Sequence, residues 1–381
     1  MIIKAAHPRP QFSIADIVRR HEGALAARHA LSLPQKRLLG AIAICRTPAL
    51  GGHLHVCTSC GEEHPVYHSC RKRGCPICQS ADQETWIQAR ASRVLKVRHF
   101  HVVFTLPSEL RRLARGHPTD IYNALFWAVG EILRELAQTR MKATLGATMV
   151  LHTWTRDLRF HPHIHALVTA GGLSEDGSHF IHSSENYLFP VEAMGELLRG
   201  KMLDALRKLW GKGAFPEVEA DDFESLTTAL ASHKRWVVYA QKPFRKADHL
   251  LAYLGRYTHR VGISNSRLKK VTEESVTFST KDGKTATLHP VEFLRRFVQH
   301  VLPPGFHKIR HSGLYADGSA GGKLEQARAL IDAEAKNDAA EKPATTESQP
   351  HVPPDRRCPS CGGPLLCIAV LPRLRAPPKA A

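Results

Sequence analysis

The stretch Phe160-His161-Pro162-His163-Ile164-His165 places an imidazole at every second position. Side chains alternate between the two faces of a β-strand, so His161, His163 and His165 would project together from one face. The apolar residues of the stretch would then face a core. Three neighbouring imidazoles suit a divalent metal ion. The stretch therefore predicts a metal-binding strand, whose ion could polarise a phosphate as a Lewis acid.

A second segment about 90 residues further on, Tyr253-Leu254-Gly255-Arg256-Tyr257, carries two phenols one helical turn apart. In a helix, Tyr253 and Tyr257 would share one face. A phenol is a weak nucleophile until nearby cations favour the phenolate, and Arg256 and Arg260 lie close in sequence. Helix spacing alone favours two interfacial tyrosines. Together with a metal-binding strand, the pair instead predicts a nucleophile for a phosphodiester.

Two Cys-x-x-Cys pairs, 14 residues apart, stand near the N-terminus. Each pair can direct both thiolates at one ion, and two pairs supply the tetrahedral set that Zn²⁺ prefers. The spacing predicts one closed, structural zinc site. Its expected ligands are Cys57, Cys60, Cys75 and Cys78, with Cys70 as a fifth candidate.

Basic residues follow Cys70 directly, and the expected role of the zinc site is to present Arg71, Lys72 and Arg73 to DNA. In the tail, Cys358, Cys361 and Cys367 offer three thiolates. They could form a half-site completed by a histidine such as His351 or by another chain, and a zinc-free tail is equally compatible with the sequence. Cys45 is expected in the core.

The chain has 381 residues and a formal net charge of +18, with a pI near 9.7. This excess favours a polyanionic partner, although a generally basic soluble protein would have the same charge. The longest apolar run, residues 38–45, is too short to span a bilayer, and no apolar signal segment follows residues 1–4. We expect a cytoplasmic protein without a membrane partner, where cysteines are metal ligands more often than disulfides.

Composition and periodicity suggest three consecutive domains. Residues 1–97 would form a small helical zinc-binding domain, and residues 98–318 would form a catalytic domain of strands and helices that holds the histidine strand and the tyrosine pair. Residues 319–381 would hold a helix, a flexible linker and the cysteine-containing tail. Helices are expected at 14–45, 119–140, 192–211, 245–260, 291–301 and 323–340, and strands at 99–106, 148–154, 159–169, 236–240, 276–279 and 286–288.

Taken together, five segments resemble the IS91 family of transposases, which belongs to the HUH superfamily of single-strand endonucleases. The resemblance runs in order over roughly residues 40–315. The segments that carry it are 68–79, 101–107, 161–165, 253–260 and 301–310.

The resemblance implies an α+β fold, in which a central antiparallel sheet with flanking helices follows an N-terminal zinc-binding domain. It matches His163 and His165 to the family's metal pair, with Mg²⁺ or Mn²⁺ as the catalytic ion. It matches Tyr253 and Tyr257 to the family's tyrosines, which attack single-stranded DNA at transposon ends and form a 5′-phosphotyrosine. Two tyrosines permit the two strand transfers of rolling-circle transposition, although both need not act. Strand geometry makes His161 the first choice for a third metal ligand, with His152 second.

A single-strand groove needs cations along the backbone. The candidates are Arg256, Arg260, Arg267, Lys269, Lys270, Arg295, Arg296, Lys308 and Arg310. Two other function classes remain open at this stage. A zinc-ribbon regulator would bind DNA without cutting it but has no use for the histidine strand. A metal-dependent nuclease using water would need a general base, and Asp157 is the one acidic residue near that strand.

Overall fold

The computed structural model describes residues 11–78, 93–244, 262–316, 322–338 and 357–374. Two compact units are each assembled from separate parts of the chain. The cysteine unit comprises Met1–Asp82, Ile263–Val301 and Pro343–Ala381, and the histidine unit comprises Gln83–Gly262 and Leu302–Lys342.

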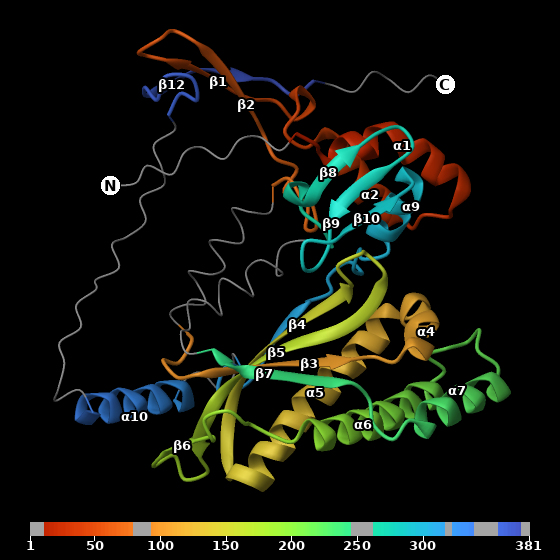
Figure 1. The fold of residues 1–381 in the computed structure, drawn as a ribbon, viewed down its shortest axis with the longest axis vertical. Coiled ribbons are helices and arrows are strands. Elements are labelled where there is room, and N and C mark those ends of the chain that lie inside the picture. The colour runs from red at the N-terminus through yellow and green to blue at the C-terminus, as the bar shows by residue number, and fades with distance from the viewer. Residues whose placement is uncertain (1–10, 79–92, 245–261, 317–321, 339–356, 375–381) are drawn as a thin grey trace. The chain divides into compact units, whose positions relative to one another are not determined.

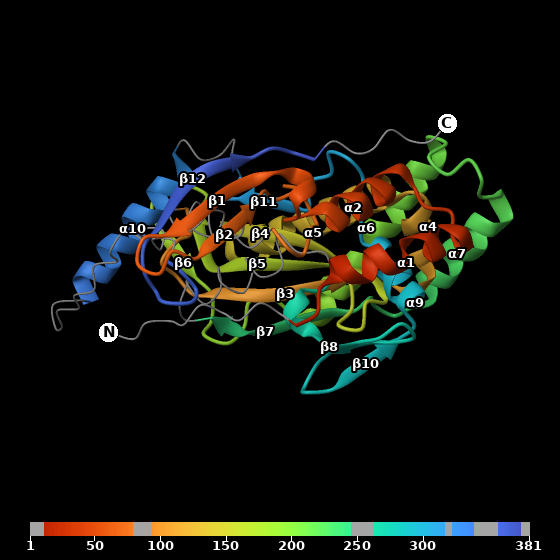
Figure 2. The ribbon, with the colours of Figure 1, turned by 90° about the horizontal axis from the view of Figure 1, so that it is seen from above.

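The histidine unit is built on an antiparallel sheet in the order β11-β4-β5-β3-β7, with β6 paired to β5 (Figure 2). This confirms the predicted α+β class and central antiparallel sheet. The strands are β3 (His99–Thr105), β4 (Ala143–Trp154), β5 (Phe160–Ser174), β6 (Phe180–His182), β7 (Val238–Phe244) and β11 (Ile309–Gly313).

Helices cover one face of this sheet, and Figure 1 shows α5 and α6 on the same side of it. These helices are α4 (Arg111–Gly116), α5 (Pro118–Met141), α6 (Val191–Gly211) and α7 (Ala220–Ser232), with a 3₁₀ turn at Ser108–Leu110. A further helix, α10 (Lys323–Asp338), packs in a separate core cluster with Leu173 of β5 and Phe180 of β6. Proline stands at the first position of α5, where its missing N–H costs no hydrogen bond of the helix. The buried residues of α5 recur every three or four positions and form one apolar stripe. Members of this stripe are Ile121, Leu125, Val129, Ile132 and Leu136.

The sheet has two chemically different faces because strand residues alternate. On β5, Ile164, Ala166 and Val168 belong to the core under the helices. The intervening residues, including His163 and His165, lie on the opposite face. One strand thus contributes both to the core and to a row of imidazoles.

The cysteine unit contains two small sheets and a cluster of helices. Its elements are α1 (Ile14–Arg28), α2 (Leu33–Ile44), β1 (Gly52–Cys57), β2 (Glu63–Tyr67), β8 (Leu268–Val271), β9 (Val276–Ser279), β10 (Thr285–Leu288), α9 (Pro290–Val298) and β12 (Leu365–Leu371), with 3₁₀ turns at Pro48–Leu50 and Asn265–Arg267. The helix predicted over 14–45 is two helices, since Ser32 and Gln35 form a capping box that starts α2.

The units do not follow the predicted boundaries 1–97, 98–318 and 319–381. Residues 263–301 belong to the cysteine unit, where the Gln35 side chain donates to the Val298 carbonyl at 3.0 Å and the Ile14 N–H donates to Asn265 Oδ1 at 3.0 Å. The tail joins the same unit because β12 pairs with β1. These contacts join distant segments, which local composition does not reveal. No helix among the residues with described structure is long and apolar enough to cross a bilayer.

A buried histidine, His99, predicts how the stability of the histidine unit depends on pH. Its Nδ1–H donates to the Val97 carbonyl at 2.9 Å, and its Nε2 accepts from the Tyr315 hydroxyl at 2.8 Å. Burial lowers the pKa of His99 to about 4. The unfolded chain takes up this proton near pH 6.5, so stability is full above that pH and falls as pH drops toward 4, by up to about 3 kcal/mol.

We therefore expect His99→Gln to flatten the decline of the unfolding free energy between pH 7 and pH 5, measured by urea denaturation. His179→Gln is the control, because His179 lies on the surface. Equal pH slopes in wild type and His99→Gln would contradict this assignment.

Candidate functional site

Three histidines meet on the sheet face opposite the helices. His152 on β4 and His163 and His165 on β5 offer ring nitrogens that all lie within 4.8 Å of one another. His163 Nε2 and His165 Nε2 are 3.0 Å apart. The structure thus brings together the two histidines that matched the family's metal pair.

The third member of this set is His152, and the first-choice ligand His161 is not part of it. His152 is the direct cross-strand partner of His163. Opposite residues of an antiparallel pair lie about 4.5–5.5 Å apart, closer than residues i and i+2 along one strand. Alternation along β5 alone predicted His161 as the third metal ligand. That prediction took no account of the neighbouring strand β4, which brings His152 opposite His163.

Hydrogen bonds fix the protons of the metal pair. The Nδ1–H of His163 donates to the His161 carbonyl at 2.7 Å. On the other ring, His165 Nδ1 lies 2.7 Å from His101 Nε2, and His101 Nδ1 lies 3.0 Å from Gln241 Oε1. An amide oxygen only accepts, so His101 carries its proton on Nδ1 and accepts the His165 Nδ1–H at Nε2.

Both Nε2 atoms therefore present lone pairs to each other across 3.0 Å. Two lone pairs at this distance repel each other unless a cation lies between or beside them. Burial lowers the pKa of His163 to about 4 and holds the pKa values of His152 and His165 well below the usual range. The three rings are neutral at pH 7, as metal ligands must be. Two ligands at right angles on one ion, each about 2.1 Å away, are about 3.0 Å apart. The donor set fits a divalent metal.

Other side chains support the third histidine. Trp154 stacks on His152 with ring centroids 4.8 Å apart and planes 16° from parallel. Lys308 is buried, and its positive charge contributes to the low pKa of His152. The Trp154 ring thus packs against a metal-ligand candidate, and the positive charge of Lys308 acts on the same imidazole.

The supporting pair His101 and Gln241 could not be identified from the sequence as part of the site. His101 lies in one of the segments that carried the family resemblance, but its role depends on β3 pairing with β5 and β7.

We expect His101→Ala to weaken Mn²⁺ binding about 10–100-fold, because loss of the hydrogen bond to His165 frees the ring to change its orientation and tautomer. Isothermal titration of the full-length protein measures the affinity. His161→Ala is the matched control, since this neighbouring histidine lies outside the set, and it should leave the affinity within about twofold. Equal losses in both variants would contradict the role of His101.

The predicted nucleophiles Tyr253 and Tyr257 lie outside the described residues, together with Arg256 and Arg260.

The cysteines form two sets, where the sequence spacing predicted one. Cys45, Cys70, Cys75 and Cys78 make the first set, and Cys57, Cys60, Cys358 and Cys361 make the second. The two Cys-x-x-Cys pairs near the N-terminus therefore belong to different sets. Cys45, expected as a core residue, completes the first set.

The first set is compact, and three of its four cysteines are buried. Cys70 Sγ lies 3.7 Å from Cys78 Sγ, and Cys75 is fully buried. Hydrogen bonds from the thiols of Cys45 and Cys75 lower the pKa of Cys78. Sulfurs around a tetrahedral Zn²⁺ are about 3.8 Å apart, given Zn–S bonds of about 2.3 Å. The spacing fits zinc.

Two ligands of the first set lie on either side, in sequence, of three basic residues, which we call the basic triplet. Arg71, Lys72 and Arg73 are exposed between two of its ligands, Cys70 and Cys75. Arg267 behaves differently, because its guanidinium donates to the Ser279 carbonyl at 2.6–2.9 Å and lies 5.7 Å from the Phe278 ring. These contacts hold the Arg267 guanidinium against the small β8–β9–β10 sheet, and its contact with DNA stays a prediction.

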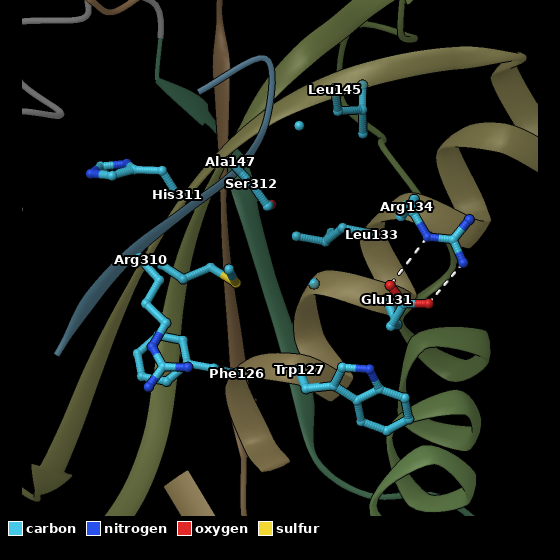
Figure 3. A pocket seen from close by; sticks show the side chains of 13 residues that line it. Phe126, Trp127, Glu131, Leu133, Arg134, Leu145, Ala147, Arg310, His311 and Ser312 are labelled. Atoms are coloured by element: carbon cyan, nitrogen blue, oxygen red, sulfur yellow. Dashed lines mark hydrogen bonds and ion pairs between the residues drawn. The ribbon is translucent and has the colours of Figure 1, made fainter. Parts of the chain in front are cut away.

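A pocket of about 340 Å³ lies between α5, β4 and β11 (Figure 3). It is lined by Ala147 and Met149, which face the helices rather than the histidines. Arg310, a predicted DNA contact, stacks over Phe126 at 4.3 Å beside this pocket. The pocket is therefore not part of the histidine site.

Comparison with known proteins shows which families and relatives this chain resembles. A family model described as "Transposase zinc-binding domain" matches residues 17–106, and one described as "Putative transposase" matches residues 146–322. The chain is 37% identical over 393 aligned positions to "Putative transposase y4qJ" of Sinorhizobium fredii, covering 96% of this chain and 97% of the relative. It is 30% identical over 297 positions to the "Transposase for insertion sequence element IS801" of Pseudomonas savastanoi pv. phaseolicola, covering 73% of this chain and 69% of the relative. No solved structure matches the chain.

These matches define a DNA transposase with an N-terminal zinc-binding domain. The chain belongs to the IS91 family of transposases, as the sequence motifs indicated. DNA is therefore its partner. The zinc-binding family match and the cysteine sets together support structural zinc in the cysteine unit.

Proposed function

We propose that this transposase nicks single-stranded DNA at the ends of its element through a tyrosine and rejoins the strands in rolling-circle transposition. The observation that carries the proposal is the facing pair of neutral Nε2 atoms on His163 and His165. With His152 they form a donor set for Mg²⁺ or Mn²⁺ on the sheet face opposite α5 and α6. The family membership supports the same assignment.

The ion, when bound, supplies Lewis-acid polarisation of the scissile phosphate. The histidines fix its position, and Lys308 adds a buried positive charge near His152. The phenol oxygen of Tyr253 or Tyr257 attacks the phosphorus and loses its proton. The bond from phosphorus to the 3′ oxygen breaks, that oxygen leaves as a hydroxyl after gaining a proton, and the DNA stays linked as a 5′-phosphotyrosine. A second tyrosine permits a second transfer.

The test is incubation of 3′-labelled single-stranded DNA from an element end with the protein and Mn²⁺, followed by a denaturing gel. A labelled protein–DNA adduct that the Tyr253→Phe/Tyr257→Phe double variant does not form is the expected result. Cleavage without an adduct would instead indicate a water-using nuclease. Binding without cleavage of a confirmed cognate strand would indicate a regulator.

The basic triplet supplies a testable DNA contact. Each phosphate contact to a single strand contributes about 0.7 to the slope of log affinity against log salt, so three contacts contribute about 2. We expect Arg71→Ala/Lys72→Ala/Arg73→Ala to reduce the measured slope by about 2. The control removes two exposed lysines of the β9–β10 turn, Lys281 and Lys284. An equal change per charge in the control would indicate nonspecific attraction.

A further inference from the structure

The second cysteine set joins the two ends of the chain. Cys57 Sγ lies 3.4 Å from Cys361 Sγ, and Cys60 Sγ lies 3.8 Å from Cys358 Sγ. A disulfide would hold two sulfurs about 2.05 Å apart, whereas sulfurs sharing a tetrahedral zinc ion are about 3.8 Å apart. The spacing is that of four thiolates around one ion.

The two halves of this set are built alike. Residues 57–61 and 358–362 both read Cys-x-Ser-Cys-Gly. Each closing glycine has a positive φ, 75° at Gly61 and 77° at Gly362, which glycine adopts without strain. Each glycine N–H donates at 2.9 Å to the carbonyl of the first cysteine of its turn. Two matching turns that meet sulfur to sulfur form the arrangement of paired zinc knuckles.

The surrounding backbone holds the turns together. β12 pairs with β1 in antiparallel register, with Cys57 opposite Leu365, and the Thr58 N–H donates to the Pro364 carbonyl at 3.1 Å. His64 Nε2 lies 3.2 Å from Cys358 Sγ, where an N–H can donate to a thiolate. Figure 1 shows the three-stranded sheet β12-β1-β2. The cysteine set lies at one end of this sheet, where β1 ends at Cys57 and β12 begins at Leu365.

We infer that Cys57, Cys60, Cys358 and Cys361 hold a second structural zinc ion, which fastens the tail strand β12 to β1. The matched zinc-binding region ends at residue 106, so it contains only two of these four ligands. Zn²⁺ is the expected ion because four thiolates form a soft, closed tetrahedral set. The C-terminal segment thereby completes a fold whose other strands lie near the N-terminus.

The test compares zinc content among full-length variants by native mass spectrometry and elemental analysis. Cys358→Ser/Cys361→Ser should carry one zinc ion fewer than wild type. Hydrogen exchange should increase in β12 and β1, while the strands of the histidine unit keep their protection. Cys367→Ser is the matched control, since this exposed cysteine of β12 lies outside the set and should leave the zinc count unchanged.

A rescue variant separates ligand loss from misfolding. Cys361→His should retain the second zinc, because three cysteines and one histidine also form a structural zinc site and position 361 is exposed. Three results would overturn the inference. They are an unchanged zinc count in the double serine variant, the same zinc loss in Cys367→Ser, and a Cys57–Cys361 disulfide in non-reducing peptide maps.

Discussion

His163→Ala is expected to lower the rate of strand cleavage about a thousandfold at saturating Mn²⁺, equivalent to about 4 kcal/mol of transition-state stabilisation. The ring supplies one of the two facing nitrogens and is buried, so no water or neighbouring side chain replaces it in the same position. Single-turnover cleavage of a labelled strand measures the rate. Binding of the same strand without metal should stay within about twofold, since the variant removes a metal ligand and no DNA contact.

The neighbouring histidines provide the controls. His152→Ala should cause a loss of similar size, because His152 completes the donor set, whereas His161→Ala should change the rate less than about fivefold. A large loss in His161→Ala together with near-normal His152→Ala would show that the third ligand lies on β5. It would contradict the arrangement described above.

Cys75→Ser is expected to release one zinc ion and to destabilise the cysteine unit by at least about 4 kcal/mol, because structural zinc contributes of order 10 kcal/mol in small zinc-binding domains. Cys75 is fully buried in the first cysteine set, and a serine oxygen is a poorer zinc ligand than a thiolate. Hydrogen exchange under increasing denaturant measures this destabilisation segment by segment. α1, α2 and α9 should lose protection at lower denaturant than in wild type, while β3–β5 are unaffected.

Loss of the zinc should also weaken DNA binding, since the exposed segment Arg71–Arg73 lies between Cys70 and Cys75. Cys45→Ser should reproduce both effects, because Cys45 belongs to the same set. Unchanged zinc content in Cys45→Ser would show that Cys45 is a core residue and not a zinc ligand. Unchanged stability in Cys75→Ser would mean that the first set is not structural.

The strand β5 and the closeness of the His163 and His165 rings could be predicted from the sequence, because both depend on local alternation. β5 carries apolar residues and histidines on opposite faces, and the six consecutive residues 160–165 are enough to show this alternation. The third histidine depends on which strand lies beside β5 and in which register, and His152 is opposite His163 only after β4 and β5 pair. The same is true of His101, whose role needs the β3–β5 pairing.

The cysteines show the same division. Cys-x-x-Cys pairs mark zinc ligands reliably because the spacing within a pair is local. Which pairs share an ion is a property of the tertiary fold, and proximity in sequence wrongly united Cys57 and Cys60 with Cys75 and Cys78. The actual partner pair, Cys358 and Cys361, lies about 300 residues away and is brought in by the pairing of β12 with β1.

The measurement that tests the central claim most directly is mass spectrometry of the linked peptide. The protein is incubated with single-stranded DNA and Mn²⁺, denatured, digested with nuclease and protease, and searched for a nucleotide attached to a peptide. The account predicts a 5′-phosphonucleotide on Tyr253 or Tyr257, absent in His163→Ala. A free 5′-phosphate on cleaved DNA, with no nucleotide on either tyrosine, would contradict it.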